Sequence, residues 1–158
     1  MSEKIRAAIF SALGDVSGLT AADVYAGSGA VGLEAISRGA TQVTFIDNLK
    51  ASLVYLRDNV RLLELDKNQY RLFDKTVSNW CRQEERQFNL LFVDPPYAAP
   101  DPAILPALKE RLLVGGILVL SWPGKTDMPA IAGLDRVKQK SYGDAQVGYY
   151  RRTDLISL

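Results

Sequence analysis

Apolar residues follow two spacings that alternate along the chain, and each spacing predicts one kind of element. Short apolar runs predict strands over residues 22–26, 42–47, 70–73, 88–93 and 117–122. Apolar residues that recur every three or four positions predict helices over residues 5–13, 33–38, 50–65, 76–85 and 104–113. Strands that alternate with helices pair in parallel, because each helix returns the chain to the same end of the sheet. The pattern therefore predicts a parallel α/β sheet.

The end of the chain has a different pattern. Gly115-Gly116 predicts a turn before the fifth strand, and residues 135–142 and 146–152 predict two strands joined at Gly143-Asp144. Such a hairpin adds antiparallel strands to one edge of the sheet. We therefore expect a Rossmann-like α/β fold with a seven-stranded, mostly parallel sheet and a C-terminal antiparallel hairpin.

Composition limits both the size and the chemistry of the protein. A chain of 158 residues with 47% hydrophobic content can bury one core, so we expect a single domain over residues 1–158. Because the chain has no histidine, histidine bases and histidine-rich metal sites are excluded, and no metal is expected. Cys81 is the only cysteine, which excludes an internal disulfide. The net charge of +1 neither favours nor excludes a nucleic-acid partner.

The apolar stretches are only as long as strands. None reaches the roughly 20 residues that a membrane-spanning helix needs, and the first residues lack the apolar core of a signal peptide. We therefore expect a cytoplasmic monomer that does not contact membranes.

A glycine loop joins the first strand to the helix that follows it. Gly27-Ser28-Gly29-Ala30-Val31-Gly32, preceded by Ala26, satisfies the G-x-G-x-x-G pattern, in which small residues let a ligand approach the backbone and the helix start. Alone, this pattern also fits a tight turn without a ligand. Asp47 ends the second strand about 20 residues later, where a carboxylate accepts hydrogen bonds from ribose hydroxyls. NAD and S-adenosylmethionine share that ribose, so the loop and Asp47 predict a nucleoside cofactor without choosing between the two.

Two further acidic residues lie near predicted strand ends, and each has two interpretations. Asp74 could accept a hydrogen bond from an adenine amino group, or it could cap the following helix. Asp23 could contact the methionine amino group of S-adenosylmethionine, or it could brace the glycine loop.

The tetrapeptide Asp94-Pro95-Pro96-Tyr97 follows an almost wholly apolar strand. An exocyclic amine on a base is a poor nucleophile, because its lone pair is delocalised into the ring. Asp94 and the Pro95 carbonyl can each accept one amino hydrogen, which orients the lone pair toward a methyl donor and stabilises the positive charge that develops on nitrogen. The prolines fix the backbone, and Tyr97 can stack on the base. Alone, the motif also fits a proline turn with a solvated Asp, but its place after the fourth strand favours amino methylation.

These segments together resemble one known family, the RsmD-type 16S ribosomal RNA guanine-N2 methyltransferases, which have the class I S-adenosylmethionine-dependent methyltransferase fold. The resemblance covers nearly the whole chain and rests on residues 5–10, 23–35, 37–40 and 92–97. It implies methyl transfer from S-adenosylmethionine to a guanine of small-subunit ribosomal RNA, either free or in a partly assembled subunit.

The resemblance also implies roles for individual residues. The cofactor site would be lined by Asp23, Gly27, Gly29, Asp47 and Asp74. The guanine amino group would be held by Asp94, Pro95 and Tyr97. Residues 142–152 would form the closing hairpin of the family.

Two features depart from the family pattern. Members usually have an N-terminal extension with an Arg-Pro-Thr segment before the opening helix, whereas this sequence begins almost at that helix. Part of the RNA-binding and cofactor-covering surface is therefore expected to be missing. The acid that ends the second strand is commonly Glu in the family and is Asp47 here, a shorter carboxylate with the same chemistry.

A flipped guanine also needs basic residues that contact phosphate groups. The predicted contacts are Lys4, Arg6 and Arg38, and other basic candidates are Lys138, Lys140, Arg151 and Arg152. Three rival functions stay open: an N-methyltransferase for DNA adenine or protein glutamine, an NAD-linked oxidoreductase, and a non-catalytic nucleotide-binding module. DNA enzymes usually carry a separate target-recognition region for which 158 residues leave no room, and protein-glutamine enzymes more often have Asn in place of Asp94.

Overall fold

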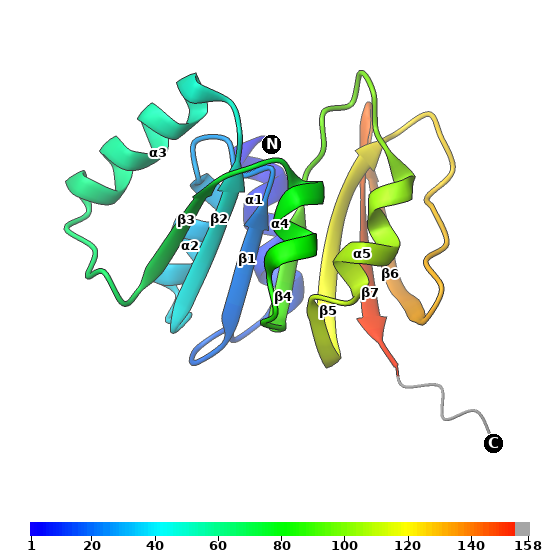
Figure 1. The fold of residues 1–158 in the computed structure, drawn as a ribbon. Helices are drawn as coiled ribbons and strands as arrows, with labels where there is room; N and C mark the ends of the chain where they lie inside the picture. The colour runs from blue at the N-terminus through cyan, green and yellow to red at the C-terminus, as the bar shows by residue number, and fades with distance from the viewer. Residues whose placement is uncertain (154–158) are drawn as a thin grey trace.

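Seven strands form one mixed sheet in the computed structural model, which describes residues 1–153 (Figure 1). The strands are β1 Thr20–Val24, β2 Gln42–Asp47, β3 Tyr70–Asp74, β4 Phe88–Val93, β5 Leu112–Pro123, β6 Leu134–Tyr142 and β7 Ala145–Arg152. Their order across the sheet is β3-β2-β1-β4-β5-β7-β6. β1 to β5 pair in parallel, whereas β7 runs antiparallel to β5 and to β6. The predicted α/β class and closing hairpin are confirmed. The domain predicted over residues 1–158 includes residues 154–158, which lie outside the described part of the chain.

Helices cover both faces of the sheet. One face carries α1 Glu3–Leu13, α2 Ala30–Ser37 and α3 Lys50–Leu62, and the other carries the 3-10 turn η1 Pro102–Ile104, α4 Val77–Gln83 and α5 Leu105–Lys109. In Figure 1, α4 and α5 lie in front of the sheet and α1 and α2 lie behind it. A hydrophobic core lies on each face of the sheet, and β4 contributes side chains to both. Leu91 packs on the α4 side, and Leu90 packs on the α1 side. This burial on both faces explains why every residue of β4 except Asn89 is apolar.

The predicted helix over residues 104–113 is confirmed only as far as Lys109, and the predicted turn at Gly115-Gly116 is wrong. α5 ends at Lys109, and Leu112 already belongs to β5, where it is fully buried and pairs with Phe88. Both glycines lie inside β5, where the pairing with β4 shifts register between Phe88 and Leu90. Gly115 has a φ of 81°, a left-handed conformation that lets the strand bulge without leaving the sheet.

The predicted first strand, over residues 22–26, lies two residues later in the sequence than β1. β1 ends at Val24 rather than Ala26, because Tyr25 has a φ of 60° and turns the chain out of the sheet. A left-handed conformation is uncommon for a bulky residue and is often stored at functional sites. β1 and β4 are neighbours at the point where the chain reverses its direction of travel across the sheet. Ligands of open α/β sheets bind beside such a point, at the carboxyl ends of the strands.

Among residues 1–153, no helix is long and apolar enough to cross a bilayer.

Candidate functional site

The register of the parallel strands brings several predicted site residues to one level. Val24 of β1 pairs with Ile46 of β2 and with Val93 of β4. The next residues along these two strands are Asp47 and Asp94. β5 pairs with β4 so that Ser121 comes level with Asp94. A row of side chains therefore crosses the carboxyl edge of the sheet in the order Asp47, Tyr25, Asp94 and Ser121.

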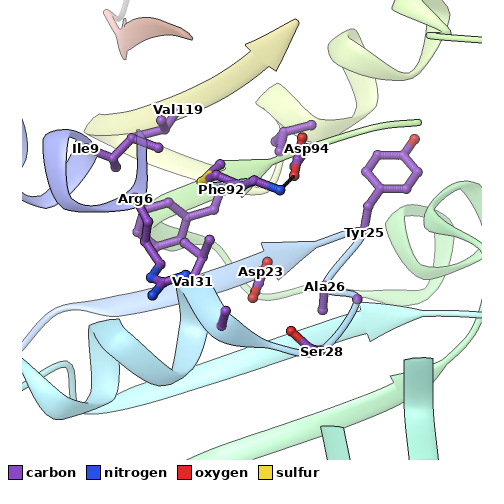
Figure 2. A pocket seen from close by; sticks show the side chains of 14 residues that line it. Arg6, Ile9, Asp23, Tyr25, Ala26, Ser28, Val31, Phe92, Asp94 and Val119 are labelled. Atoms are coloured by element: carbon purple, nitrogen blue, oxygen red, sulfur yellow. Dashed lines mark ion pairs between the residues drawn. The ribbon is translucent and has the colours of Figure 1, made fainter. Parts of the chain in front are cut away.

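Three adjoining cavities open around this row, and Tyr25 lines all three. The inner cavity, about 160 Å³, reaches down to Asp23 (Figure 2). The outer cavity, about 640 Å³, extends from Asp47 to the Asp-Pro-Pro-Tyr motif. The side cavity, about 260 Å³, lies between Asp47 and the start of α4. Asp94 lines both the inner and the outer cavity, so a reaction between two ligands in these cavities would take place beside its carboxylate.

Asp23 is a buried carboxyl at the bottom of the inner cavity, with only 3% of its surface exposed. One of its oxygens, Oδ2, accepts a 2.9 Å hydrogen bond from the Gly32 backbone N–H. Burial raises the pKa of Asp23 to about 8 despite that hydrogen bond, and the charges of Asp94 and Asp47 add to the increase. Figure 2 shows Asp23 and Asp94 on neighbouring strands, facing the same space. A cation bound there would favour the ionised form of Asp23.

Asp47 fixes the glycine loop to the end of β2. Its Oδ2 accepts a 2.8 Å hydrogen bond from the Gly27 N–H, and its Oδ1 accepts a 2.9 Å hydrogen bond from the Leu49 N–H. Each carboxylate oxygen can accept a second hydrogen bond, so Asp47 can still receive hydroxyl groups from the outer or the side cavity that it lines. Its predicted contact with ribose stays a prediction.

The three glycines of the loop do different things. A Cβ at Gly27 would meet no atom within 4 Å, and this residue lines the inner and outer cavities. A Cβ at Gly32 would lie 2.4 Å from Phe45, and one at Gly29 would lie 2.2 Å from Leu56. Gly27 therefore leaves room for a ligand, whereas Gly29 and Gly32 leave room for β2 and α3.

The Asp-Pro-Pro-Tyr motif lines the outer cavity with all four residues. The Asp94 N–H donates to the Val24 carbonyl at 3.4 Å, which holds the motif beside the end of β1. Burial raises the pKa of the Asp94 carboxyl, and this increase is opposed by the amino group of Met1 and by a hydrogen bond from Ser121. The Met1 nitrogen lies 3.8 Å from Asp94 Oδ2. Pro95 is buried, and Tyr97 is 38% exposed.

Most of the predicted cofactor residues come together, but two do not line any of the three cavities. The inner cavity is lined by Asp23, Ala26, Gly27 and Ser28. Gly29 lies beneath the loop, as its contact with Leu56 shows. Asp74 is exposed at the end of β3, and its neighbours Lys75 and Thr76 line the side cavity instead. Thr76 rather than Asp74 caps α4, because its side chain accepts from the Asn79 N–H.

Two of the three predicted phosphate contacts are held in ion pairs. Arg6 Nε lies 3.0 Å from Glu34 Oε1, and Arg38 Nε lies 2.8 Å from Glu34 Oε2. The Arg38 guanidinium also lies over the Phe10 ring, 5.0 Å from its centroid. These arginines fasten α1 to α2, although Arg6 also lines the inner cavity. Lys4 is exposed on the other flank of α1.

Sequence reasoning did not single out two residues that lie at the centre of the site. Tyr25 lines all three cavities. Its left-handed φ could not be predicted, because tyrosine rarely adopts this conformation and no turn pattern surrounds it. Ser121 lies within an apolar strand that otherwise reads as core, and only its polarity there could have drawn attention to it. The strand register is what brings both residues level with Asp94.

The fold is that of class I methyltransferases, with a mostly parallel sheet, a glycine loop at the switch point and an antiparallel β7 between β5 and β6. An Escherichia coli structure named "Putative methyltransferase yhhF" has the same fold, with a TM-score of 0.87 over 96% of this chain and 86% of that chain at 24% identity.

The chain belongs to the family described as "Conserved hypothetical protein 95", whose model matches residues 1–151, and this is the RsmD family of ribosomal RNA methyltransferases. It is 28% identical to "Putative rRNA methyltransferase YlbH" of Bacillus subtilis, over 96% of this chain and 86% of that protein. It is 34% identical to "Ribosomal RNA small subunit methyltransferase D" of Haemophilus influenzae, over 48% of this chain and 40% of that protein. The resemblance found in the sequence is thereby confirmed at the level of the family.

The residues present fit S-adenosylmethionine, the cofactor of this family. This molecule carries an ammonium, a sulfonium and one carboxylate, and its two positive groups favour a cavity that contains two carboxyls, Asp23 and Asp94. The open side of Gly27 allows close approach to the backbone. NAD carries two phosphates instead, and an acidic inner cavity opposes such a ligand.

Proposed function

We propose that this protein transfers a methyl group from S-adenosylmethionine to the exocyclic N2 of a guanine in small-subunit ribosomal RNA. The observation that carries the proposal is the position of Asp94, which stands between the inner and the outer cavity and level with Asp47 and Tyr25. Membership of the RsmD family supports the ribosomal RNA substrate. The choice of guanine as the methylated base and of 16S RNA as the substrate is the more specific part of the proposal.

The residues that would hold the cofactor follow from the cavities. Asp23 would accept hydrogen bonds from the ammonium in the inner cavity, and Asp47 would accept from the ribose hydroxyls. The adenine would occupy the side cavity, between Tyr25 and the start of α4 at Val77. Asp74 stands at the strand end beside that cavity and would reach the adenine amino group only from its rim.

The remaining chemistry falls to the Asp-Pro-Pro-Tyr motif. S-adenosylmethionine supplies an electrophilic methyl group on a positively charged sulfur. Asp94 and the Pro95 carbonyl each accept one hydrogen of the guanine amino group, which turns the nitrogen lone pair toward the inner cavity. As nitrogen becomes positive, the same two acceptors stabilise the charge, and the Asp94 carboxylate can take the released proton. Tyr97 lies at the open side of the outer cavity, where its ring can stack on the base.

A basic strip on β6 favours RNA as the carrier of that guanine. Lys138 and Lys140 lie on one face of β6, with their Nζ atoms 5.8 Å and 5.4 Å from the ring centroids of Tyr149 and Tyr142. Among the described residues, neither lysine lies within ion-pair distance of a carboxylate. The β6–β7 turn leads this strip to the outer cavity, which Ala145 lines. Lys138 and Lys140 are therefore better placed for phosphate groups than the paired Arg6 and Arg38.

Methyl transfer by Asp94→Ala tests the proposal. The variant should lose transfer of labelled methyl groups to small subunits by about 100-fold or more, because the acceptor of the amino hydrogens is gone. Its affinity for S-adenosylhomocysteine, measured by calorimetry, should stay within about twofold of the wild type, because this ligand lacks the positive sulfonium and because Asp23, Gly27 and Asp47 are intact. Asp58→Asn, which removes an exposed carboxylate of α3, should have normal activity. Unchanged transfer by Asp94→Ala would refute the assigned role.

Two further measurements separate the rival functions. Mass spectrometry of the nucleosides from methylated RNA should identify N2-methylguanosine, and a methylated adenine in DNA or a methylated glutamine in protein would point to the other N-methyltransferases. Binding of NAD without binding of S-adenosylhomocysteine would favour the oxidoreductase. Cofactor binding with no transfer to any of these substrates would favour the non-catalytic module.

A further inference from the structure

Ser121 is a buried polar residue in an apolar strand. Its neighbours on β5 include Leu118, Val119, Leu120 and Trp122, all of which are buried apolar residues. Ser121 itself is 2% exposed and lines the outer cavity. A hydroxyl buried in such a place needs a hydrogen-bond partner, because an unpaired polar group there destabilises the fold.

The hydroxyl of Ser121 faces both ends of the motif. Its Oγ is hydrogen-bonded to Tyr97 Oη. Ser121 also stands level with Asp94 in the register of β4 and β5, and both residues line the outer cavity, so the hydroxyl is placed to donate to the Asp94 carboxylate and to oppose the rise of the Asp94 pKa caused by burial. A serine hydroxyl has one hydrogen but can accept two. Since an ionised carboxylate can only accept, a Ser121 hydroxyl that donates to Asp94 would accept from the Tyr97 hydroxyl.

Ser121 therefore lies beside both ends of the motif. The Tyr97 hydroxyl is held at β5, so the ring cannot turn freely about the proline segment. A hydrogen bond from Ser121 to one oxygen of Asp94 would leave the other oxygen free for an amino hydrogen. Asp94 Oδ2 is the oxygen within 3.8 Å of a nitrogen, that of Met1, and it is therefore reachable by a donor from outside the sheet.

We propose that Ser121 is a positioning residue, which holds the Asp94 carboxylate and the Tyr97 ring in the geometry that receives the methyl acceptor. This role rests on the proposed function, because it serves the residues assigned to the acceptor amino group. A purely structural hydroxyl would affect only folding. A positioning hydroxyl also affects turnover and the pH at which Asp94 ionises.

Kinetics of three variants test the role. Ser121→Ala should lower kcat about 10- to 100-fold, the effect of one hydrogen bond to a charged group, with the KM for RNA changed less than threefold. Ser121→Thr keeps a hydroxyl and should recover most of kcat. Tyr97→Phe keeps the ring but loses the donor, so it should fall between the wild type and Ser121→Ala. Equal loss in the Ala and Thr variants, or wild-type kcat in Ser121→Ala, would overturn the proposal.

The pKa of Asp94 gives a readout that needs no RNA. A carboxylate that loses a donor holds its proton more tightly, so Ser121→Ala should raise the Asp94 pKa. In the pH profile of kcat, the acidic limb should move to higher pH, because more of the carboxyl is protonated at a given pH. NMR titration of carboxyl-labelled protein measures the same shift directly, and an unchanged Asp94 pKa in this variant overturns the proposal. If the wild type methylates no RNA, the proposed function is wrong. The titration would still show whether Ser121 interacts with the Asp94 carboxylate.

Discussion

The two halves of the site are held together by different kinds of contact. On β1 and β2, buried Asp23 and Asp47 are fixed by the backbone N–H groups of Gly32, Gly27 and Leu49. On β4 and β5, the Asp-Pro-Pro-Tyr motif has fewer such bonds, because the Asp94 N–H donates to Val24 at 3.4 Å and the Tyr97 hydroxyl is hydrogen-bonded to the side chain of Ser121. The first half, which we call the glycine-loop half, is part of the folded core. The second, which we call the Asp94 half, lies on top of it.

We therefore expect substitutions in the two halves to affect different properties of the protein. Substitutions in the glycine-loop half should change cofactor affinity and the free energy of unfolding together. Substitutions in the Asp94 half should change turnover while the fold and the cofactor affinity stay the same, as proposed for Asp94→Ala. Functional sites that store unfavourable groups in the core commonly show such a conflict between stability and function.

Asp23→Asn should give the largest effect in the glycine-loop half. The variant loses a charged partner for the cofactor ammonium, so the Kd for S-adenosylhomocysteine should rise about 10- to 100-fold at pH 8 and above. In the wild type, affinity should increase as pH rises toward and past 8, because the cation prefers the ionised form of Asp23. Calorimetry at several pH values should find no such increase in the variant. Equal affinity of the two proteins at pH 8.5 would contradict the assigned contact.

The same substitution should stabilise the protein without cofactor. The pKa of Asp23 is raised to about 8 in the folded state and is about 3.9 in unfolded chains, so the folded state binds the proton more tightly. The free energy of unfolding therefore falls as pH rises from about 4 to 8, and Asn removes this loss. Thermal unfolding at pH 8 should give a higher Tm for the variant, and Asp58→Asn serves as the exposed control.

Alanine at two glycines should sharpen the contrast within the loop. At Gly32, the new Cβ would lie 2.4 Å from Phe45 and 2.9 Å from Val43, so overpacking should cost about 1–3 kcal/mol of stability. At Gly27, the Cβ meets open space, and only the left-handed backbone, with a φ of 59°, opposes it, at about 1 kcal/mol. Urea unfolding should therefore rank Gly32→Ala as the less stable variant. The opposite order would mean that Gly27 is also packed against the protein.

Removal of the basic strip should give the smallest effect. The double variant Lys138→Gln/Lys140→Gln should raise the KM for RNA about two- to fivefold at moderate salt and reduce the salt dependence of binding, because two phosphate contacts are lost. The kcat and the cofactor affinity should not change. Arg57→Gln/Lys67→Gln removes the same charge from exposed positions on and after α3 and is the matched control. Equal salt dependence in both double variants would place the RNA elsewhere.

Much of the fold could be predicted from local pattern. The apolar strands, the helices between them and the closing hairpin follow from periodicity, which depends on neighbours a few residues apart. The boundaries at Lys109 and Gly115 failed because pairing with β4 decided the conformation, and the boundary at Val24 failed because Tyr25 turns the chain out of the sheet. Gly115-Gly116 is typical of a turn, but β4 keeps both residues inside the sheet.

For the site, the sequence by itself determined the chemical groups: the glycine loop, the acidic strand ends and the Asp-Pro-Pro-Tyr motif, which together led to the RsmD family. Only the tertiary structure decided which of these groups face a cavity. It turned Gly29 and Gly32 toward the core, left Asp74 at the surface, paired Arg6 and Arg38 with Glu34, and brought Tyr25 and Ser121 level with Asp94. The physical reason is that a residue type fixes what a side chain can bind, whereas strand register and packing fix what it can reach.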